Sequence, residues 1–292
     1  MGNATSGHAA RHGEAAKSAS AAGWALVTGA TGGLGRAFAR ELAERGHPIL
    51  LVARRREELE RLAREIERSG GRADVVVADL VAPDGITKVA AAAARVGGID
   101  ILVNNAGFGT FGPLLGHSPA RDLDEVSLNV GAVVALTRAL LPDMIERSHG
   151  QIVNVASMLS FMATPYFAVY GATKAFVLHF TEALAEELRG SGVRVLAVCP
   201  GVMNTDFFEA AGSSVDKQRL PPLQPETVAR AALDAAEAGR TVRIVGALAK
   251  LLVWSTRITP RFLMRRIMGA VFRSSLPPET LRRTPIRGAR EA

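Results

Sequence analysis

Short apolar runs alternate with longer amphipathic stretches from Trp24 to Val245. The apolar runs are rich in Val, Ile, Leu and Ala, as is typical of strands that are buried on both faces of a parallel sheet. The stretches between them repeat apolar residues at helical spacing. Strands and helices therefore alternate along the chain, and this pattern indicates repeated βαβ units.

The expected elements can be placed by residue number. Strands are predicted at residues 24–28, 48–53, 73–78, 99–104, 151–156, 193–198 and 241–245. Helices are predicted at residues 34–46, 55–69, 84–96, 119–148 with a bend near Asn129, 167–189 and 226–238. The predicted fold is a doubly wound, Rossmann-type α/β fold, in which a parallel sheet of about seven strands has helices on both faces.

The two ends of the chain differ from this body. Residues 1–22 are small and polar, and we expect a disordered extension. Residues 23–245 are expected to form one α/β domain, and residues 246–292 a basic, amphipathic helical tail. The apolar runs of the tail are far shorter than the roughly 20 residues that a transmembrane helix needs. Two roles remain open for residues 246–273: contact with an anionic membrane surface, or packing against protein with the arginines in water.

Charge and cysteine content narrow the function classes. The chain has a formal net charge of +7, but ten basic and two acidic residues follow Gly246, so the body is close to neutral. A nucleic-acid partner is therefore not expected. Cys199 is the only cysteine, which favours a cytoplasmic location, and we expect it to be a small buried hydrophobe. No metal site is predicted, since His179 has no second ligand at a useful spacing.

A glycine-rich turn, TGATGGLG, directly follows the first expected strand. Gly29, Gly33 and Gly35 leave room for the backbone to approach a pyrophosphate at the positive N-terminus of the next helix. A glycine-rich turn between a strand and a helix therefore predicts a dinucleotide site.

The end of the second strand predicts which dinucleotide binds. An acidic residue at this place would bind the ribose hydroxyls of NAD, but the chain has Arg54, Arg55 and Arg56. A guanidinium matches the 2′-phosphate of NADP in geometry and charge, so NADP(H) is the predicted cofactor and Arg54 its partner. Arg55 and Arg56 fit a solvated charge run at the start of a helix.

Tyr170 and Lys174, in YGATK, lie four residues apart and so share one face of a helix. The reference pKa of tyrosine is about 10, and a nearby ammonium group favours the phenolate. Ser157 lies thirteen residues before Tyr170, at the end of an expected strand. Ser160 is a nearby alternative whose spacing does not fit. These residues predict proton transfer by a tyrosine.

The turn spacing Thr-Gly-x-x-x-Gly-x-Gly, the NNAG run at residues 104–107 and YGATK together resemble the short-chain dehydrogenase/reductase superfamily over about residues 23–245. The implied catalytic residues are Asn129, Ser157, Tyr170 and Lys174. The implied cofactor contacts are Gly29, Thr31, Gly33, Leu34, Gly35, Arg54, Asp79, Leu80, Asn105, Ala106, Gly107, Tyr170, Lys174, Pro200, Gly201, Val202 and Thr205. Gly32 is a departure, because many NADP-preferring relatives have a basic residue there.

The resemblance implies a mechanism. Ser157 and Tyr170 would polarise the carbonyl oxygen of a substrate, and Tyr170 would exchange the proton during hydride transfer with NADP(H). Lys174 would bind the nicotinamide ribose and lower the pKa of Tyr170, and a water near Asn129 would pass protons to Lys174. The family also implies a homodimer or homotetramer.

The substrate is less defined by the sequence. Residues 203–223 include Phe207 and Phe208, and such a loop is suited to a lid over a hydrophobic ketone, 3-oxoacyl or steroid-like substrate. The alternatives are a catalytically idle NADP(H)-binding sensor or a membrane-surface binding module. Because the Ser, Tyr and Lys set is complete, we predict an enzyme.

Overall fold

A computed structural model of the chain describes residues 22–203, 207, 211 and 222–276. The disorder expected for the N-terminus, most of the expected lid at 203–223 and the end of the tail at 277–292 lie outside the described residues. So does Thr205.

The described residues form one sheet of seven parallel strands in the order β3-β2-β1-β4-β5-β6-β7. The strands are β1 (Ala25–Thr28), β2 (Ile49–Ala53), β3 (Ala73–Val77), β4 (Ile101–Asn104), β5 (Gly150–Val155), β6 (Val193–Pro200) and β7 (Val242–Val245). The strand order reverses direction between β1 and β4, which is the topological switch point of a doubly wound sheet. The predicted fold is confirmed.

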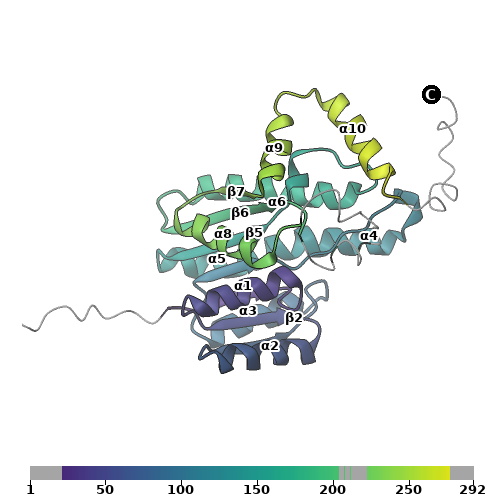
Figure 1. Cartoon of the computed structure of the whole chain (residues 1–292). Helices are drawn as coiled ribbons and strands as arrows, with labels where there is room; N and C mark the ends of the chain where they lie inside the picture. The colour runs from purple at the N-terminus through teal and green to yellow at the C-terminus, as the bar shows by residue number, and fades with distance from the viewer. Residues whose placement is uncertain (1–21, 204–206, 208–210, 212–221, 277–292) are drawn as a thin grey trace, which may run out of the picture.

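Helices cover both faces of the sheet (Figure 1). One face carries α1 (Gly33–Glu44), α2 (Arg56–Arg68) and α8 (Pro225–Glu237); the other carries α3 (Gly85–Arg95), α5 (Ala132–Glu146) and α6 (Ala168–Glu187). Successive strand residues point to opposite faces, so Ala25 and Val27 enter the first layer and Leu26 the second. Both layers bury apolar strand residues, which explains the apolar runs.

The expected bend near Asn129 is a π-helical turn. α4 (Pro119–Val126) continues through this turn (Ser127–Gly131) into α5. The whole segment Pro119–Glu146 is long and apolar enough to cross a membrane by length and composition alone. Its α5 part buries Leu136, Leu140 and Met144 against the sheet, as the core helix of such a fold does.

The first part of the tail forms two helices, α9 (Ala247–Ser255) and α10 (Arg261–Arg273). Figure 1 shows them as an inverted V beyond the two helix layers: α9 rises from the body, and α10 descends from the turn at the top. α10 buries Met264, Met268 and Phe272 against residues of the α/β domain. One face of α10 therefore packs on protein.

Candidate active site

The glycine-rich turn joins β1 to α1 at the switch point of the sheet. Gly29 has a φ of +62°, and a Cβ atom there would lie 2.9 Å from the Cα atom of Ala106. A Cβ atom on Gly35 would lie 2.2 Å from the carbonyl oxygen of Gly29. Only glycine fits either position. α1 begins at Gly33 with no side-chain cap, so its first N–H groups remain available to a phosphate.

Thr28 ties this turn to the NNAG run, a role that the sequence analysis missed. Its hydroxyl accepts hydrogen bonds from the backbone N–H groups of Asn105 (2.9 Å) and Ala106 (3.0 Å). The Asn105 side chain donates to the carbonyl oxygens of Thr28 (2.8 Å) and Gly29 (3.2 Å). The ends of β1 and β4 therefore form one rigid edge beside α1.

The three arginines after β2 differ in their contacts. Arg55 pairs with Glu58 at 2.6 Å and Arg56 with Glu60 at 3.5 Å, both within α2 or its first turn. The Arg54 side chain is 75% exposed, and its nearest carboxylate, Asp79, is 3.9 Å away. The Arg54 guanidinium is thus more available than those of Arg55 and Arg56 to bind a phosphate. Its position at this edge fits NADP(H) as the cofactor.

The other expected cofactor contacts surround the same edge. Thr31 and Leu34 belong to the turn and the start of α1, and Asp79 and Leu80 follow β3 after one residue. Pro200 ends β6, with Gly201 and Val202 just beyond it. All of these positions lie at or near the carboxyl ends of parallel strands, where ligands of doubly wound folds bind.

Ser157 and Tyr170 lie together beyond the end of β5. Ser157 caps a short 3-10 helix (Met158–Phe161), and its hydroxyl accepts a hydrogen bond from the N–H group of Leu159 at 3.1 Å. Tyr170 is in the first turn of α6 and neighbours the Ser157 hydroxyl. Ser160 instead donates to the carbonyl oxygen of Lys174 at 2.8 Å. Ser160 therefore fixes the loop to α6.

Lys174 and Asn129 approach the same point from two helices. The Nζ atom of Lys174 donates to the carbonyl oxygen of Val155 at 2.7 Å and lies 5.8 Å from the Tyr170 ring centroid. A Cβ atom on Gly107 would lie 2.7 Å from the Asn129 side-chain oxygen and 3.6 Å from the Lys174 Nζ atom. The structure thus brings all four expected catalytic residues together.

Asn129 is held by hydrogen bonds on both sides of its amide. It accepts from the N–H group of Phe108 at 3.1 Å and donates to the Phe108 carbonyl oxygen at 2.8 Å. It also donates to the Thr173 hydroxyl at 3.1 Å, and that hydroxyl donates to the Tyr170 carbonyl oxygen. Thr173, which the sequence analysis did not single out, therefore links the π-helical turn to α6.

The pKa of Tyr170 differs from expectation. Burial raises it above its usual value and outweighs the neighbouring Ser157 hydroxyl, which lowers it; the Glu125 carboxylate raises it further. Burial also lowers the pKa of Lys174 to about 8. In the protein without cofactor the pKa of Tyr170 is therefore raised, because desolvation exceeds the lowering by the Ser157 hydroxyl. The lowering expected from Lys174 stays a prediction.

Glu125, on α4, is a buried carboxyl that the sequence analysis missed. Its side chain is fully buried, and this burial raises its pKa to about 7; the neighbouring Asp122 adds to the shift, while Thr110, Arg121 and Lys174 oppose it. Its charge acts on both Tyr170 and Lys174. Its position on the polar-looking face of a short helix gave no signal of burial.

An aromatic cluster covers Tyr170. Phe167 stacks on the Tyr170 ring with centroids 4.4 Å apart, and Phe207 lies 5.1 Å from it. Phe111 and Phe272 contact Phe167 edge-on at 5.6 and 6.3 Å. The Tyr170 phenol therefore lies in an apolar environment to which α10 contributes through Phe272.

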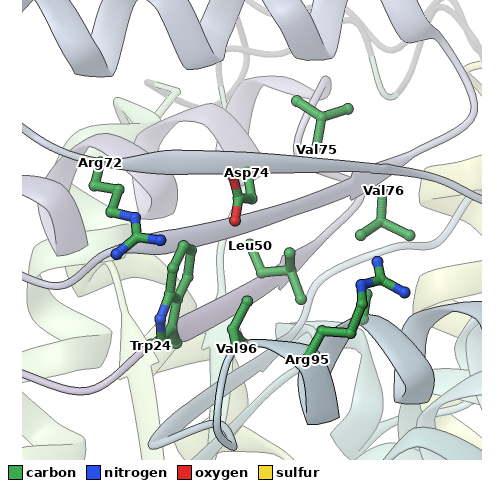
Figure 2. A pocket seen from close by; sticks show the side chains of 9 residues that line it. Trp24, Leu50, Arg72, Asp74, Val75, Val76, Arg95 and Val96 are labelled. Carbon is green, nitrogen blue, oxygen red and sulfur yellow. The ribbon is translucent and has the colours of Figure 1, made fainter.

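Hollows lie on two different sides of the described part of the chain. The first, of about 680 Å³, lies between α10 and residues 110–117 and is bordered by Leu114, Leu115, Arg266 and Arg273. The second, of about 480 Å³, lies at the opposite edge of the sheet, and Figure 2 shows the Arg72 guanidinium beside the Trp24 indole there. The second lies at the amino ends of the strands, away from the catalytic residues.

Cys199 and His179 have the environments that their sequence positions suggested. Cys199 is fully buried in β6, and burial raises the pKa of its thiol to about 12. The His179 side chain is 77% exposed and lies 3.5 Å from Glu182. No group of three His, Cys, Asp or Glu side chains among the described residues is placed to hold a metal ion.

Comparisons with known proteins match this geometry. Residues 23–216 match the family model described as short chain dehydrogenase. A very-long-chain 3-oxoacyl-CoA reductase from Anas platyrhynchos is 37% identical over 216 residues, which are 72% of this chain and 67% of that protein. The ketoacyl reductase HetN from Nostoc is 33% identical over 247 residues, which are 80% of this chain and 84% of that protein.

A solved structure of a short-chain dehydrogenase is also similar to this chain. The short-chain dehydrogenase from Sphingobium yanoikuyae in complex with NADPH is 31% identical and superimposes with a TM-score of 0.73. The match covers 81% of this chain and 93% of the other. The chain belongs to the short-chain dehydrogenase family.

Proposed function

We propose that this oxidoreductase uses NADP(H) to reduce a hydrophobic ketone, with 3-oxoacyl thioesters as the favoured substrate class. The observation that carries the proposal is the buried Tyr170 phenol, which lies beside Ser157 and under an apolar aromatic cover. Such a site excludes water and accepts an apolar carbonyl compound.

The residues divide the chemistry between them. Ser157 and Tyr170 polarise the carbonyl oxygen, and Tyr170 donates its phenolic proton to that oxygen. The raised pKa keeps the phenol protonated at neutral pH, as a proton donor in the reductive direction requires. Lys174 and Asn129 position Tyr170. They also form the route by which a new proton reaches it, through a water near Asn129. Bound nicotinamide supplies the hydride.

The cofactor edge would hold the dinucleotide through its backbone and one arginine. The uncapped start of α1 and the Gly29–Gly35 turn would receive the pyrophosphate, and Arg54 would bind the 2′-phosphate. The Sphingobium relative binds NADPH, in support of this assignment.

The substrate class rests on two arguments. The cover of Tyr170 consists of Phe111, Phe167, Phe207 and Phe272, which offer no hydrogen-bond partner to a sugar or a polar acid. The duck and Nostoc relatives are named as 3-oxoacyl-CoA and ketoacyl reductases. A long acyl chain whose keto group is separated from the thioester by one methylene fits both.

The test follows NADPH oxidation with a panel of 3-oxoacyl thioesters of increasing chain length, ketosteroids and polar ketones. We expect kcat/KM to rise with acyl chain length, since each further methylene that is buried contributes about 0.8 kcal/mol. The Tyr170→Phe variant should bind NADPH like the parent and lose most turnover. Highest activity with polar ketones would contradict the substrate class, and an active Tyr170→Phe variant would contradict the mechanism.

We further propose a cytoplasmic homodimer or homotetramer, as is usual in this family. The exposed Phe176 ring stacks on Phe180 along the outer side of α6 and offers an apolar contact. Light scattering coupled to gel filtration gives the assembly size directly, and a monomer at micromolar concentration would refute the proposal.

A further inference from the structure

The outer surface of α9 and α10 combines exposed apolar side chains with exposed basic side chains. We define the α9–α10 surface as Leu248, Leu251, Trp254, Ile258, Phe262, Leu263, Ile267 and Val271 with the basic residues Lys250, Arg257, Arg261, Arg265, Arg266 and Arg273. Each apolar member exposes at least 42% of its surface. Core packing therefore does not explain these apolar residues.

The inner faces of the two helices are already used. Ala249 and Val253 of α9, and Met264, Met268 and Phe272 of α10, are buried. Leu263, Ile267 and Val271 form a separate ridge at helical spacing beside the buried face of α10. Each helix thus has a second apolar face that no described residue covers.

The charge of the α9–α10 surface is uniform. Residues 246–276 contain six basic residues and no acidic one. All six basic side chains are exposed, and none forms an ion pair with another described residue. Apolar and cationic side chains alternate most closely from the end of α9 to the start of α10, where Trp254, Arg257, Ile258, Arg261 and Phe262 occur within nine residues.

We propose that the α9–α10 surface docks on an anionic lipid bilayer. Basic residues beside exposed Trp, Phe, Leu and Ile are the composition of an interfacial helix, in which the apolar side chains enter the headgroup region and the cations meet lipid phosphates. Tryptophan favours this interface because its ring is amphipathic.

Other occupants fit the α9–α10 surface less well. A second copy in a two-fold dimer would place the same positive surface against itself. Residues 277–292 carry four basic and two acidic residues, so this segment is repelled as well. A nucleic acid would satisfy the arginines but would leave eight exposed apolar side chains in water.

Docking would also place the larger hollow close to lipid. Arg266 and Arg273 of the α9–α10 surface border this hollow together with the exposed Leu114 and Leu115. An acyl substrate, if the proposed function holds, could then reach the enzyme from the bilayer. The docking proposal itself stands on the surface and can be tested without substrate.

The first test is co-sedimentation of the full chain with vesicles of phosphatidylcholine alone or with added phosphatidylglycerol. We expect binding only to the anionic vesicles, and weaker binding at high salt. The Arg257→Gln/Arg261→Gln variant should bind about thirtyfold more weakly, given the contribution of each basic residue near a membrane. The matched control is Arg64→Gln/Arg68→Gln, which removes the same charge from the exposed side of α2 and should bind like the parent.

The second test uses fluorescence. The chain has two tryptophans, and Trp24 is buried whereas Trp254 is 57% exposed. Subtracting the emission of the Trp254→Phe variant isolates Trp254, whose emission should shift to the blue on anionic vesicles and be quenched by brominated lipid. The proposal is overturned if Trp254 emission does not change on anionic vesicles, or if both arginine variants lose binding equally. It is also overturned if the protein is a dimer that dissociates in the Trp254→Ser/Ile258→Ser variant, since the α9–α10 surface would then be a dimer interface.

Discussion

Three buried groups lie together at the candidate active site, and their surroundings shift the pKa of each. Tyr170 and Lys174 are both desolvated, so burial raises the pKa of the phenol and lowers that of the amine to about 8. Both neutral forms are thereby favoured. Glu125 is the third member of this buried group, and its ionisation changes the field at the other two.

Glu125 should make stability depend on pH. Burial holds its pKa at about 7 in the folded protein, above the reference value of 4.5. The folded state therefore keeps a proton that the unfolded state loses, so the contribution of Glu125 to stability is fully present below pH 4.5 and is lost as the pH rises through about 7. By linkage this loss is about 3 kcal/mol.

The check is the free energy of unfolding of Glu125→Gln and of the parent across that pH range, from urea titrations. The variant should show a weaker decline than the parent, since it has no carboxyl to ionise. Asp124→Asn removes an exposed carboxylate from the same helix and should keep the decline of the parent. Parallel curves for Glu125→Gln and the parent would show that burial of Glu125 has no such effect.

Arg54 should determine the choice between the two dinucleotides. Arg54→Ala is expected to weaken NADPH binding about tenfold to a hundredfold, as loss of a charge-assisted bidentate contact does, and to leave NADH binding nearly unchanged. Fluorescence titration with both cofactors at equal salt gives the two affinities. Arg56→Ala, where the lost partner is Glu60 on the surface, is the control. An equal loss for both dinucleotides would remove the 2′-phosphate role.

At the scale of elements, the strands and helices could be predicted from the sequence because the sheet is buried on both faces. Apolar runs such as Ile49–Ala53 are typical of central strands, and the LNVGA segment contains Asn129 at the π-helical turn. The role of Thr28 and the burial of Glu125 could not be predicted. Both depend on which elements meet in space, and neither residue stands out from its neighbours in the sequence.

The turn between β1 and α1 is closely packed and leaves no room for a side chain at Gly35. Gly35→Ala would place a Cβ atom 2.2 Å from the Gly29 carbonyl oxygen, so the turn and the helix must move apart. We expect a loss of about 1–3 kcal/mol in unfolding free energy, as for other overpacked sites, together with loss of cofactor binding. Gly32→Ala adds the same methyl group 3.5 Å from that oxygen and should unfold like the parent. Equal stability of the two variants would exclude steric crowding.

At the scale of the whole molecule, the tail and the catalytic centre form one unit. The environment of Tyr170 is assembled from Phe111 after β4, Phe167 before α6, Phe207 and, from α10, Phe272. A segment that the sequence suggested was a tail thus completes the apolar cover of the Tyr170 phenol. We infer that removing α10 affects catalysis as well as any contact on its outer face.

Phe272→Ala tests this unit. The side chain is 8% exposed, and its loss should lower the unfolding free energy by about 3 kcal/mol, as for other buried phenylalanines. Water would then reach the cluster beneath it. Since burial is the main cause of the raised Tyr170 pKa, that pKa should fall toward its ordinary value.

The Phe272→Ala variant should lose activity at a lower pH than the parent. Reduction needs the protonated phenol, so a lower Tyr170 pKa moves the alkaline loss of kcat/KM to lower pH. Phe262→Ala removes the same ring from the exposed side of α10 and, with a water-soluble ketone as substrate, should keep the pH profile of the parent. If Phe272→Ala loses stability but keeps the parent profile, α10 stabilises the fold without setting the ionisation of Tyr170, and the cover over the phenol must come from Phe111, Phe167 and Phe207.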